Sequence, residues 1–365
     1  MPAIHVQRAE PTAFSESLLS QLKLPTGFQI VVFAKELGKP RMLAVHPNGS
    51  LLVTRPETGE VLMLQDQNGD GKSDQSKVIA SGLDQVHGIA VRQNQLYLAT
   101  VKEIYVSNIQ ENGISKPRAI VTNLPDGGQH FRRSLEFGKD GMMYVHIGST
   151  CNDCKEADEE HAAILQFAAD GSGRKVFAKG LRNTIGYGWH PETGEMWGMD
   201  HGSDFRGDTL PPEEFNQIKM GADYGWPLCF GKQQIDPMRP DPPGSTKAEY
   251  CKKTVGSTLE YEAHSSPIDF LFYTGTQFPA DYKNDAFVAM HGSWNRKPPS
   301  GYKVVKINFE NGKPVAFEDF ITGFLIEHGK KFISRPAGLA QGKDGSLFIS
   351  DDGNGVVYRV TYKGK

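Results

Sequence analysis

One stretch of the sequence decides the fold: AGLAQGKDGSLFI, residues 337–349. It holds a short apolar strand, a turn containing Asp344 and Gly345, and a second strand rich in apolar residues. Glycine tolerates the positive φ that tight turns require, so this pattern is typical of a β-hairpin. The number of times the hairpin pattern returns along the chain then indicates the architecture.

The pattern returns in five other places. Four copies are clear: MLAVHPNGSLLVT (42–54), HGIAVRQNQLYLA (87–99), SLEFGKDGMMYVH (134–146) and IGYGWHPETGEMW (185–197). A weaker copy joins IDFLFY (268–273) to DAFVA (285–289). A spacing of about 45–60 residues suits the four-stranded blades of a β-propeller. We therefore expect an all-β, six-bladed β-propeller over residues 24–365, with residues 1–23 as an N-terminal extension; a β-sandwich with coincidental hairpins is the alternative.

One segment breaks this rhythm. Residues 198–263 are rich in proline, glycine and charged residues, and they contain no copy of the hairpin pattern. We expect them to form a long loop excursion between blades four and five. Long loops in compact domains often carry function.

Composition and cysteine placement limit the partners and the compartment. A net charge of −3 and the absence of Lys/Arg runs argue against nucleic acid and anionic membrane surfaces. No apolar run is long enough for membrane insertion. Cys151 and Cys154 form a C-x-x-C, and Cys229 and Cys251 bracket a proline-rich loop. This placement favours two disulfides over a zinc site, with free thiols as the alternative, and favours an oxidising compartment. No export signal is visible, and nothing indicates an oligomeric state.

The polar residues just before each inner hairpin predict a binding site. A propeller brings these positions together at the mouth of its channel, and here they are Arg41, His87, Gln129 with His130, Arg182 with Asn183, His264, and Arg335. Such a set predicts a positively charged pocket for an anionic or oxygen-rich ligand. A lone histidine before a strand is more often a turn or core residue. His130 has the strongest claim, because Gly127-Gly128 and Arg132-Arg133 flank it.

A second polar pattern lies between the first two hairpins. Oxygen-bearing side chains alternate at Asp66, Asn68, Asp70 and Asp74, with glycines beside them. This spacing resembles the first part of an EF-hand loop, although the glutamate at the twelfth position is missing. The segment is either a calcium site or a turn without metal. Walker, H-E-x-x-H and G-x-S-x-G motifs are absent, so nucleotide-dependent chemistry is not indicated.

Several motifs together resemble those of a known family. They are Gln129-His130, YVHIGS (144–149), GLRN (180–183), DYGWP (223–227), HGSWNR (291–296) and RPAG (335–338). They are similar to those of the soluble PQQ-dependent sugar dehydrogenases, most closely the sorbosone dehydrogenase-like branch. The resemblance covers about Leu24 to Val360. It implies a six-bladed propeller, periplasmic or secreted, that oxidises an aldose or related aldehyde with pyrroloquinoline quinone (PQQ) and Ca²⁺ and passes electrons to a separate acceptor.

The resemblance also implies roles for individual residues. His130 matches the general base, which takes the proton of the substrate hydroxyl while hydride leaves for the quinone. Arg182 and Asn183 match the pair that grips the quinone oxygens, and Arg182 would stabilise the reduced cofactor. The backbone carbonyls of Gly202 and Ser203 match the calcium ligands.

Other matches concern the carboxylates of the cofactor and the substrate. Arg335 matches one of two arginines that bind the cofactor carboxylates, and the other polar positions of the mouth, Arg41, His87 and His264, are further cofactor candidates. The second arginine of that pair is Ala337 in this chain. The family's cofactor lysine has no clear counterpart, and Arg296 or His291 could replace it. Gln129 stands where other members have an aspartate at the substrate.

The leading hypothesis is therefore a PQQ- and calcium-dependent sugar or aldehyde dehydrogenase. One rival is a metal-dependent hydrolase of the gluconolactonase-like group, which would need several acidic side chains at the channel mouth. The other is a non-catalytic sugar-binding propeller that has lost its cofactor, which the substitution at Ala337 and the missing lysine would fit.

Overall fold

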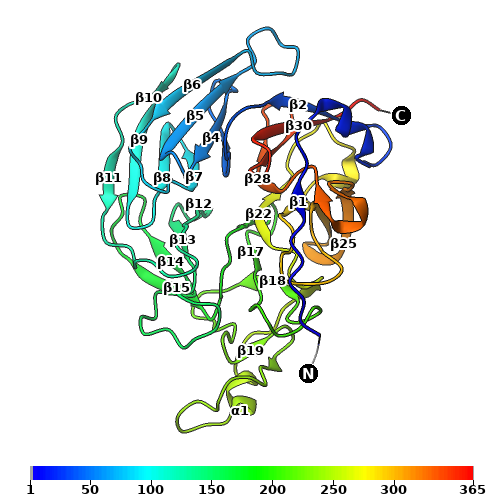
Figure 1. The fold of residues 1–365 in the computed structure, drawn as a ribbon. Coiled ribbons are helices and arrows are strands. Elements are labelled where there is room, and N and C mark those ends of the chain that lie inside the picture. Colours follow the sequence, from blue (N-terminus) through cyan, green and yellow to red (C-terminus); the bar gives the residue numbers. More distant parts are fainter. Residues whose placement is uncertain (1–2, 365) are drawn as a thin grey trace.

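The computed structural model describes residues 3–364 and consists mostly of β-strands (Figure 1). The expectation of a predominantly β fold is confirmed. Within the described residues, six sheets have four or five strands each. The first contains β3 (Leu43–Val45), β4 (Leu51–Arg55), β5 (Glu60–Gln65) and β6 (Gln75–Ala80). The second contains β7 (Gly88–Arg92), β8 (Gln95–Ala99), β9 (Ile104–Gln110), β10 (Gly113–Ile114) and β11 (Arg118–Val121).

The remaining sheets follow in chain order. The third contains β12 (Leu135–Phe137), β13 (Met143–Ile147), β14 (Ala163–Phe167) and β15 (Lys175–Lys179); the fourth contains β16 (Tyr187–Trp189), β17 (Met196–Asp200), β18 (Glu213–Ile218) and β21 (Leu259–Tyr261). The fifth contains β22 (Pro267–Phe272), β23 (Ala286–Met290), β24 (Lys303–Glu310) and β25 (Lys313–Ile321). The sixth contains β28 (Pro336–Gln341), β29 (Leu347–Asp351) and β30 (Val356–Tyr362), and its outer strand is the N-terminal β2 (Phe28–Ala34).

The hairpins expected from the repeat form the first two strands of sheets one to five, and β28 and β29 of the sixth sheet. β3 pairs with β4, β7 with β8, β12 with β13, β16 with β17, β22 with β23 and β28 with β29, and each pair is antiparallel. The outer strand β2 pairs antiparallel with β30, so residues from both ends of the chain share one sheet. Backbone hydrogen bonds between these two strands therefore join the N-terminal and C-terminal parts of the chain without a disulfide.

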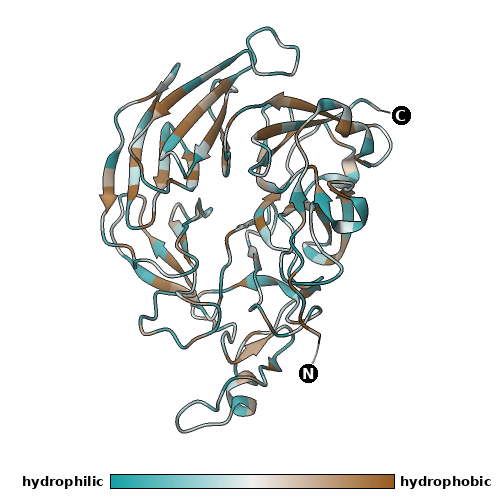
Figure 2. Cartoon of the chain, viewed as in Figure 1, coloured by the Kyte–Doolittle hydropathy of each residue, from teal (hydrophilic) through white to brown (hydrophobic). Residues whose placement is uncertain are grey.

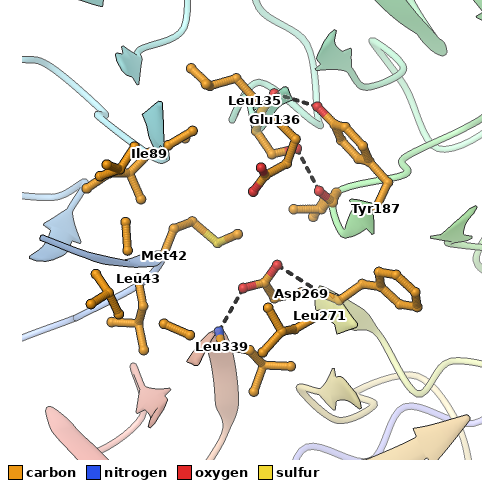
Figure 3. Close-up of a pocket in the computed structure, with 18 of the residues that line it drawn as sticks. Met42, Leu43, Ile89, Leu135, Glu136, Tyr187, Asp269, Leu271 and Leu339 are labelled. Atoms are coloured by element: carbon orange, nitrogen blue, oxygen red, sulfur yellow. Dashed lines mark hydrogen bonds between the residues drawn. The ribbon is translucent and has the colours of Figure 1, made fainter. Parts of the chain in front are cut away.

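The sheets surround a central cavity of about 310 Å³ (Figure 3). Its wall takes residues from the first strand of all six sheets, among them Leu43, Ile89, Leu135, Tyr187, Leu271 and Leu339. Two carboxylates, Glu136 and Asp269, face the cavity from different sheets. Asp269 also accepts a hydrogen bond of 2.7 Å from the backbone N–H of Leu339, which joins β22 to β28. The inner strands of all six sheets therefore line the same cavity.

The core lies between neighbouring sheets. The middle strands are apolar over most of their length because both of their faces are covered: all five residues of β13, β14 and β23 are buried. Figure 2 shows the hydrophobic residues concentrated in the strands and the hydrophilic residues in the connections. The largest buried cluster lies between the fifth and sixth sheets and includes Phe287, Phe320, Phe324 and Tyr358. This packing leaves the connecting loops free to carry polar side chains.

The segment 198–263 is more ordered than expected. The prediction of one long excursion is wrong for β18 and β21, which are regular strands of the fourth sheet. The sequence of β18 is EEFNQI, and both Glu213 and Glu214 are buried. Because a hydrophobicity pattern treats glutamate as a surface residue, it does not predict a strand here. The irregular part lies between these two strands and holds β19 (Cys229–Phe230), β20 (Gln234–Ile235) and the short helix α1 (Lys247–Cys251).

The four cysteines form two disulfides, Cys151–Cys154 and Cys229–Cys251, as the sequence favoured. The N-terminal residues pack across the loop between β23 and β24 of the fifth sheet and across the connection from the fifth sheet to the sixth. There, β1 (Glu10–Pro11) pairs in parallel with β27 (Lys331–Phe332), and the N–H of Gln7 bonds to the carbonyl of Trp294. Among residues 3–364, no helix has the length and apolar character needed to cross a membrane.

Candidate active site

His130 lies in the connection between β11 and β12, and its ring has a defined tautomer. Its Nδ1 is 3.1 Å from the carbonyl oxygen of Ser149 and 2.8 Å from the Ser149 hydroxyl. A carbonyl oxygen can only accept, so Nδ1 carries the hydrogen and donates it. The Ser149 hydroxyl donates in turn to the carbonyl of Cys151 at 2.8 Å. The neutral ring therefore presents the lone pair of Nε2, for which the described residues provide no hydrogen-bond partner.

The surroundings of His130 favour its neutral form. Burial, followed by the positive charge of Arg182 and the nearby His201, lowers the pKa of His130 to about 2. A neutral imidazole with a free Nε2 can accept a proton, which is the property that a general base needs. A bound anion would offset the effect of Arg182 and move the pKa back towards neutrality.

Gly148 allows His130 and Asn183 to approach each other. A Cβ at Gly148 would lie 2.5 Å from the Cβ of His130, 2.7 Å from its carbonyl oxygen and 2.8 Å from Oδ1 of Asn183. The backbone N–H of Ser149 donates to the carbonyl of Arg182 at 2.8 Å. The segment after β13 therefore touches both the histidine and the Arg182-Asn183 pair predicted from the sequence.

Arg182 is 3% exposed and is held by a loop from the third sheet. Its Nε donates to the carbonyl of Asn152 and its Nη2 donates to Asn152 Oδ1, both at 2.9 Å. Asn152 Oδ1 also accepts from the N–H of Asp204 at 2.8 Å, and the Asp204 carboxylate lies 3.6 Å from the guanidinium. Asn152 thus fixes the plane of the guanidinium by two contacts.

Asp200, at the end of β17, orders the backbone of the same pair. Its carboxylate accepts from the N–H groups of Arg182 (3.0 Å) and Asn183 (2.7 Å) and from the hydroxyl of Thr184 (2.8 Å). Burial raises the pKa of Asp200 to about 6, and these donors oppose that rise. The amide side chain of Asn183 is 5% exposed and has no hydrogen-bond partner among the described residues. It is available to a ligand.

The candidate metal ligands Gly202 and Ser203 follow β17 directly. The N–H of Gly202 donates to the buried carboxylate of Glu213, and the hydroxyl of Ser203 accepts from the indole N–H of Trp226 at 3.0 Å. Within residues 3–364, neither carbonyl oxygen accepts a hydrogen bond. Backbone carbonyls of this kind are suitable ligands for Ca²⁺.

The other end of the site is positively charged. Arg41 and His291 both contact Asp352: Arg41 Nη1 at 2.6 Å and His291 Nε2 at 2.7 Å. Burial alone would raise the pKa of Asp352, but His291 and Arg41 outweigh it and hold that pKa well below its ordinary value. Arg335 donates to the carbonyls of His291 (3.2 Å) and Gly292 (2.9 Å). Arg41, His291 and Arg335 thus line one pocket.

Two other predicted residues, His87 and His264, have different surroundings. His87 is fully buried; its Nδ1 bonds to the carbonyl of Arg133 at 3.0 Å, and its Nε2 has no partner in the described chain. His264 bonds through Nε2 to the carbonyl of Gly207 at 2.8 Å and through Nδ1 to the side chain of Asn295. His264 therefore has no ring nitrogen left for a cofactor.

The side chain of Arg296 is also bound by other protein groups. It donates to the carbonyls of Pro298 (2.8 Å) and Ala263 (2.9 Å) and pairs with Glu262 at 3.0 Å. The structure gives Arg296 the role of holding loops together, and it does not bring this side chain to the pocket of Arg41 and Arg335. Among the two residues considered for the missing lysine, His291 is the one that lines that pocket.

The acidic loop of residues 66–74 lies elsewhere, between β5 and β6, the two outer strands of the first sheet (Figure 1). Asp66 accepts from the N–H groups of Gly69 and Gly71, Asn68 from that of Asp70, and Asp74 from those of Gln67 and Asn68. The oxygen atoms that would bind calcium are used to cap the loop's own backbone. The loop does not contribute to the channel mouth.

Gln129 is exposed and stands beside His130, and its N–H donates to the carbonyl of Thr150 at 2.8 Å. The sequence pattern missed four residues that position the predicted ones: Ser149, Asn152, Asp200 and Asp352. Three of them follow the ends of β13, β17 or β29 or lie at those ends, at the same mouth of the channel. A search at strand ends as well as strand starts would have found them.

Comparisons with known proteins identify the family of the chain. An uncharacterised protein of Borreliella burgdorferi is 31% identical, with 96% of this chain and 94% of that protein covered. A PQQ-dependent sugar dehydrogenase of Hypocrea jecorina is 25% identical, with 91% and 87% covered. A PQQ-dependent pyranose dehydrogenase of Coprinopsis cinerea is 24% identical over 93% of this chain, which spans about half (54%) of that longer protein.

A solved structure gives the same relationship at the level of the fold. The calcium structure of a carbohydrate-active enzyme of family AA12 from Trichoderma reesei has a TM-score of 0.80 at 23% identity and covers 93% of this chain and 97% of that one. The sequence pattern of the family described as TrAA12-like matches residues 22–363. The chain therefore belongs to the TrAA12-like family.

Proposed function

We propose that this protein is a PQQ- and Ca²⁺-dependent oxidoreductase that oxidises an aldose or sugar-derived aldehyde. The family membership and the names of the Hypocrea and Coprinopsis relatives support this class of reaction. The observation that carries the proposal is the hydrogen bonding of His130, whose Nδ1–H is bound by Ser149 while Nε2 keeps a free lone pair. In this role His130 takes the proton of the substrate hydroxyl through Nε2.

The donors present fit such a cofactor. PQQ carries carboxylates and quinone oxygens, and the site offers unpaired polar atoms for both: the side-chain amide of Asn183, Nε of Arg41 and the carbonyl oxygens of Gly202 and Ser203. Asn183 and Arg182 would hold the quinone end, and the two carbonyls would hold Ca²⁺. Arg41, Arg335 and His291 would face the carboxylates, with His87 behind them. When bound, PQQ supplies the two-electron acceptor and Ca²⁺ supplies Lewis acidity.

The remaining residues act on orientation and charge. Arg182, fixed in its plane by Asn152, stabilises negative charge that develops next to it. Gln129, exposed beside the base, would contact the substrate. We further propose that the six sheets are the blades of one six-bladed propeller spanning residues 24–365, that residues 1–23 are an extension, and that the protein works in the periplasm or outside the cell with a separate electron acceptor. The disulfides support that location.

The test is reconstitution of the purified protein with PQQ and Ca²⁺, followed by dye reduction with a panel of aldoses, aldehydes and lactones. We expect PQQ-dependent dye reduction with at least one sugar, and His130→Ala should lower turnover about 10²- to 10⁴-fold while PQQ still binds. Exposed His328, changed to Gln, is the matched control and should have no effect. Absence of PQQ binding, or lactone cleavage without PQQ, would refute the proposal in favour of the binding or hydrolase alternatives.

A further inference from the structure

The positively charged end of the site is a pocket of about 290 Å³ that we call the carboxylate pocket. Its wall contains four cationic side chains, Lys39, Arg41, Arg132 and Arg335, and two carboxylates, Glu57 and Asp352. Pro11 of the N-terminal extension also lines it. The cations outnumber the carboxylates, so the pocket favours an anionic ligand.

Both carboxylates of the pocket already have partners. Glu57 pairs with Lys39 at 2.7 Å, and Asp352 is shared between Arg41 and His291. Arg335 and Arg132 are therefore left without a carboxylate among the described residues. Arg335 still donates to two carbonyls, whereas the guanidinium of Arg132 makes no hydrogen bond to residues 3–364, and its buried Nε has no partner there.

The unpaired state of Arg132 is energetically costly. Its side chain is partly buried, its guanidinium lies over the ring of Phe131, and burial followed by the charge of Arg41 lowers the pKa of Arg132. Unpaired donors and cations taken from water cost free energy unless a partner replaces the water. An anion placed against Arg132 would remove this cost.

The adjacent arginine shows what a structural role looks like. Arg133 is completely buried and donates to the carbonyls of Val101, His130 and Pro125. Its hydrogen bonds go entirely to the protein, and it does not line the carboxylate pocket. Arg132 therefore differs from its neighbour in lining the pocket and in having no hydrogen-bond partner among the described residues.

The position of Ala337 leaves a gap in positive charge nearby. Ala337 is fully buried and packs with Met42, Ile185 and Ile268 in an apolar cluster, so β28 contributes no cation at this position. Arg132 comes from a different segment, two residues after His130 in the connection between β11 and β12.

We infer that Arg132 binds a carboxylate of the cofactor and supplies, from the His130 segment, the positive charge that Ala337 does not provide. This inference rests on the proposed function. It links the proton acceptor and the carboxylate contact through one short segment, so binding of the cofactor would also order the residues next to His130.

The test is the affinity for PQQ, measured by quenching of tryptophan fluorescence in the presence of Ca²⁺ at low and high NaCl. Arg132→Gln should raise the Kd roughly 10- to 100-fold, because a charge-assisted contact is lost, and should weaken the salt dependence. Arg132→Lys keeps the charge but not the planar fork, and should lie between. Arg118, exposed on β11, gives the matched control Arg118→Gln, which should bind PQQ as the wild type does.

Thermal unfolding without PQQ separates a binding role from a structural one. Because Arg132 donates no hydrogen bond to any group of residues 3–364, Arg132→Gln should melt at or above the wild-type temperature. Wild-type affinity for PQQ in both Arg132→Gln and Arg132→Lys would overturn the inference and leave the proposed function intact. Failure of the wild-type protein to bind PQQ would overturn the proposed function and the inference with it.

Discussion

Gly148 offers the most direct test of how the site is built. Its missing side chain leaves room for the Cβ and carbonyl oxygen of His130 and for Oδ1 of Asn183, which would all lie within 2.8 Å of an added Cβ. The two nearest atoms are the Cβ and the backbone carbonyl oxygen of His130, so rotation of a flexible side chain cannot relieve the clash with His130. In Gly148→Ala, we expect His130 or Asn183 to be displaced.

The magnitude follows from the distances. Overpacking of this kind costs about 1–3 kcal/mol of stability. With an unfolding entropy of about 2.1 cal/mol/K per residue, this corresponds to a fall in Tm of roughly 1–4 °C for a chain of 365 residues. The effect on catalysis should be larger, since a displacement of about 1 Å at a reacting group can cost about 100-fold in rate.

Gly188→Ala is the matched control, because the same methyl group at that position would meet the ring of Phe270 at 3.6 Å, an ordinary contact. The assays are thermal unfolding, PQQ affinity and steady-state dye reduction. We expect Gly148→Ala to lose turnover far beyond its small loss of stability, while Gly188→Ala keeps both. Wild-type turnover in Gly148→Ala would refute the geometry given for His130 and Asn183.

Three further outcomes are expected. Replacing Cys151 and Cys154 together by Ser should lower turnover without preventing folding, because their loop holds Arg182; unchanged kinetics would contradict this. Burial, followed by the charge of Asp269, raises the pKa of Glu136 from 4.5 to about 8, so its stabilising contribution is complete below about pH 4.5 and is lost as pH rises through 8. Glu136→Gln should therefore show a smaller fall in Tm between pH 6 and pH 9 than the wild type does. Asp70→Asn should leave PQQ- and Ca²⁺-dependent activity unchanged, since the loop of residues 66–74 caps its own backbone, and a loss of activity would restore that loop as a calcium site.

The sequence was sufficient for the hairpins because their apolar strands and glycine turns are local signals. β28 and β29, which the opening stretch predicted, are separated by a turn in which Gly345 has a φ of 84°. β18 escaped the same reasoning, since Glu213 and Glu214 are buried through contacts with residues distant in sequence: Glu213 accepts from Gly202 and Ser266, and Glu214 from Gly231. Such satisfaction of a buried carboxyl group is a tertiary property, and no local pattern reveals it.

In the candidate site, too, the sequence predicts positions set by the repeat but not the contacts that depend on the tertiary fold. Positions before the inner hairpins made His130, Arg182 and Arg335 candidates, because topology alone brings equivalent positions of a repeat to one end. The partners of those residues come from strand ends, as in the contact of Asp352 with Arg41, 311 residues apart. Arg296 had the right residue type and motif but contacts Ala263 and Glu262, and only these tertiary contacts distinguish it from a pocket residue.

The segment from Gly148 to Cys154 explains why His130, the proposed proton acceptor, and the Arg182-Asn183 pair should be treated as one unit. Ser149 fixes the tautomer of His130, and Asn152, three residues later, fixes the guanidinium of Arg182. Because the Cys151–Cys154 disulfide closes the chain around Asn152, a movement of either contact is transmitted to the other over a very short distance. Substitutions at Ser149 and Asn152 should therefore be non-additive, with the double variant losing less turnover than the product of the single losses predicts.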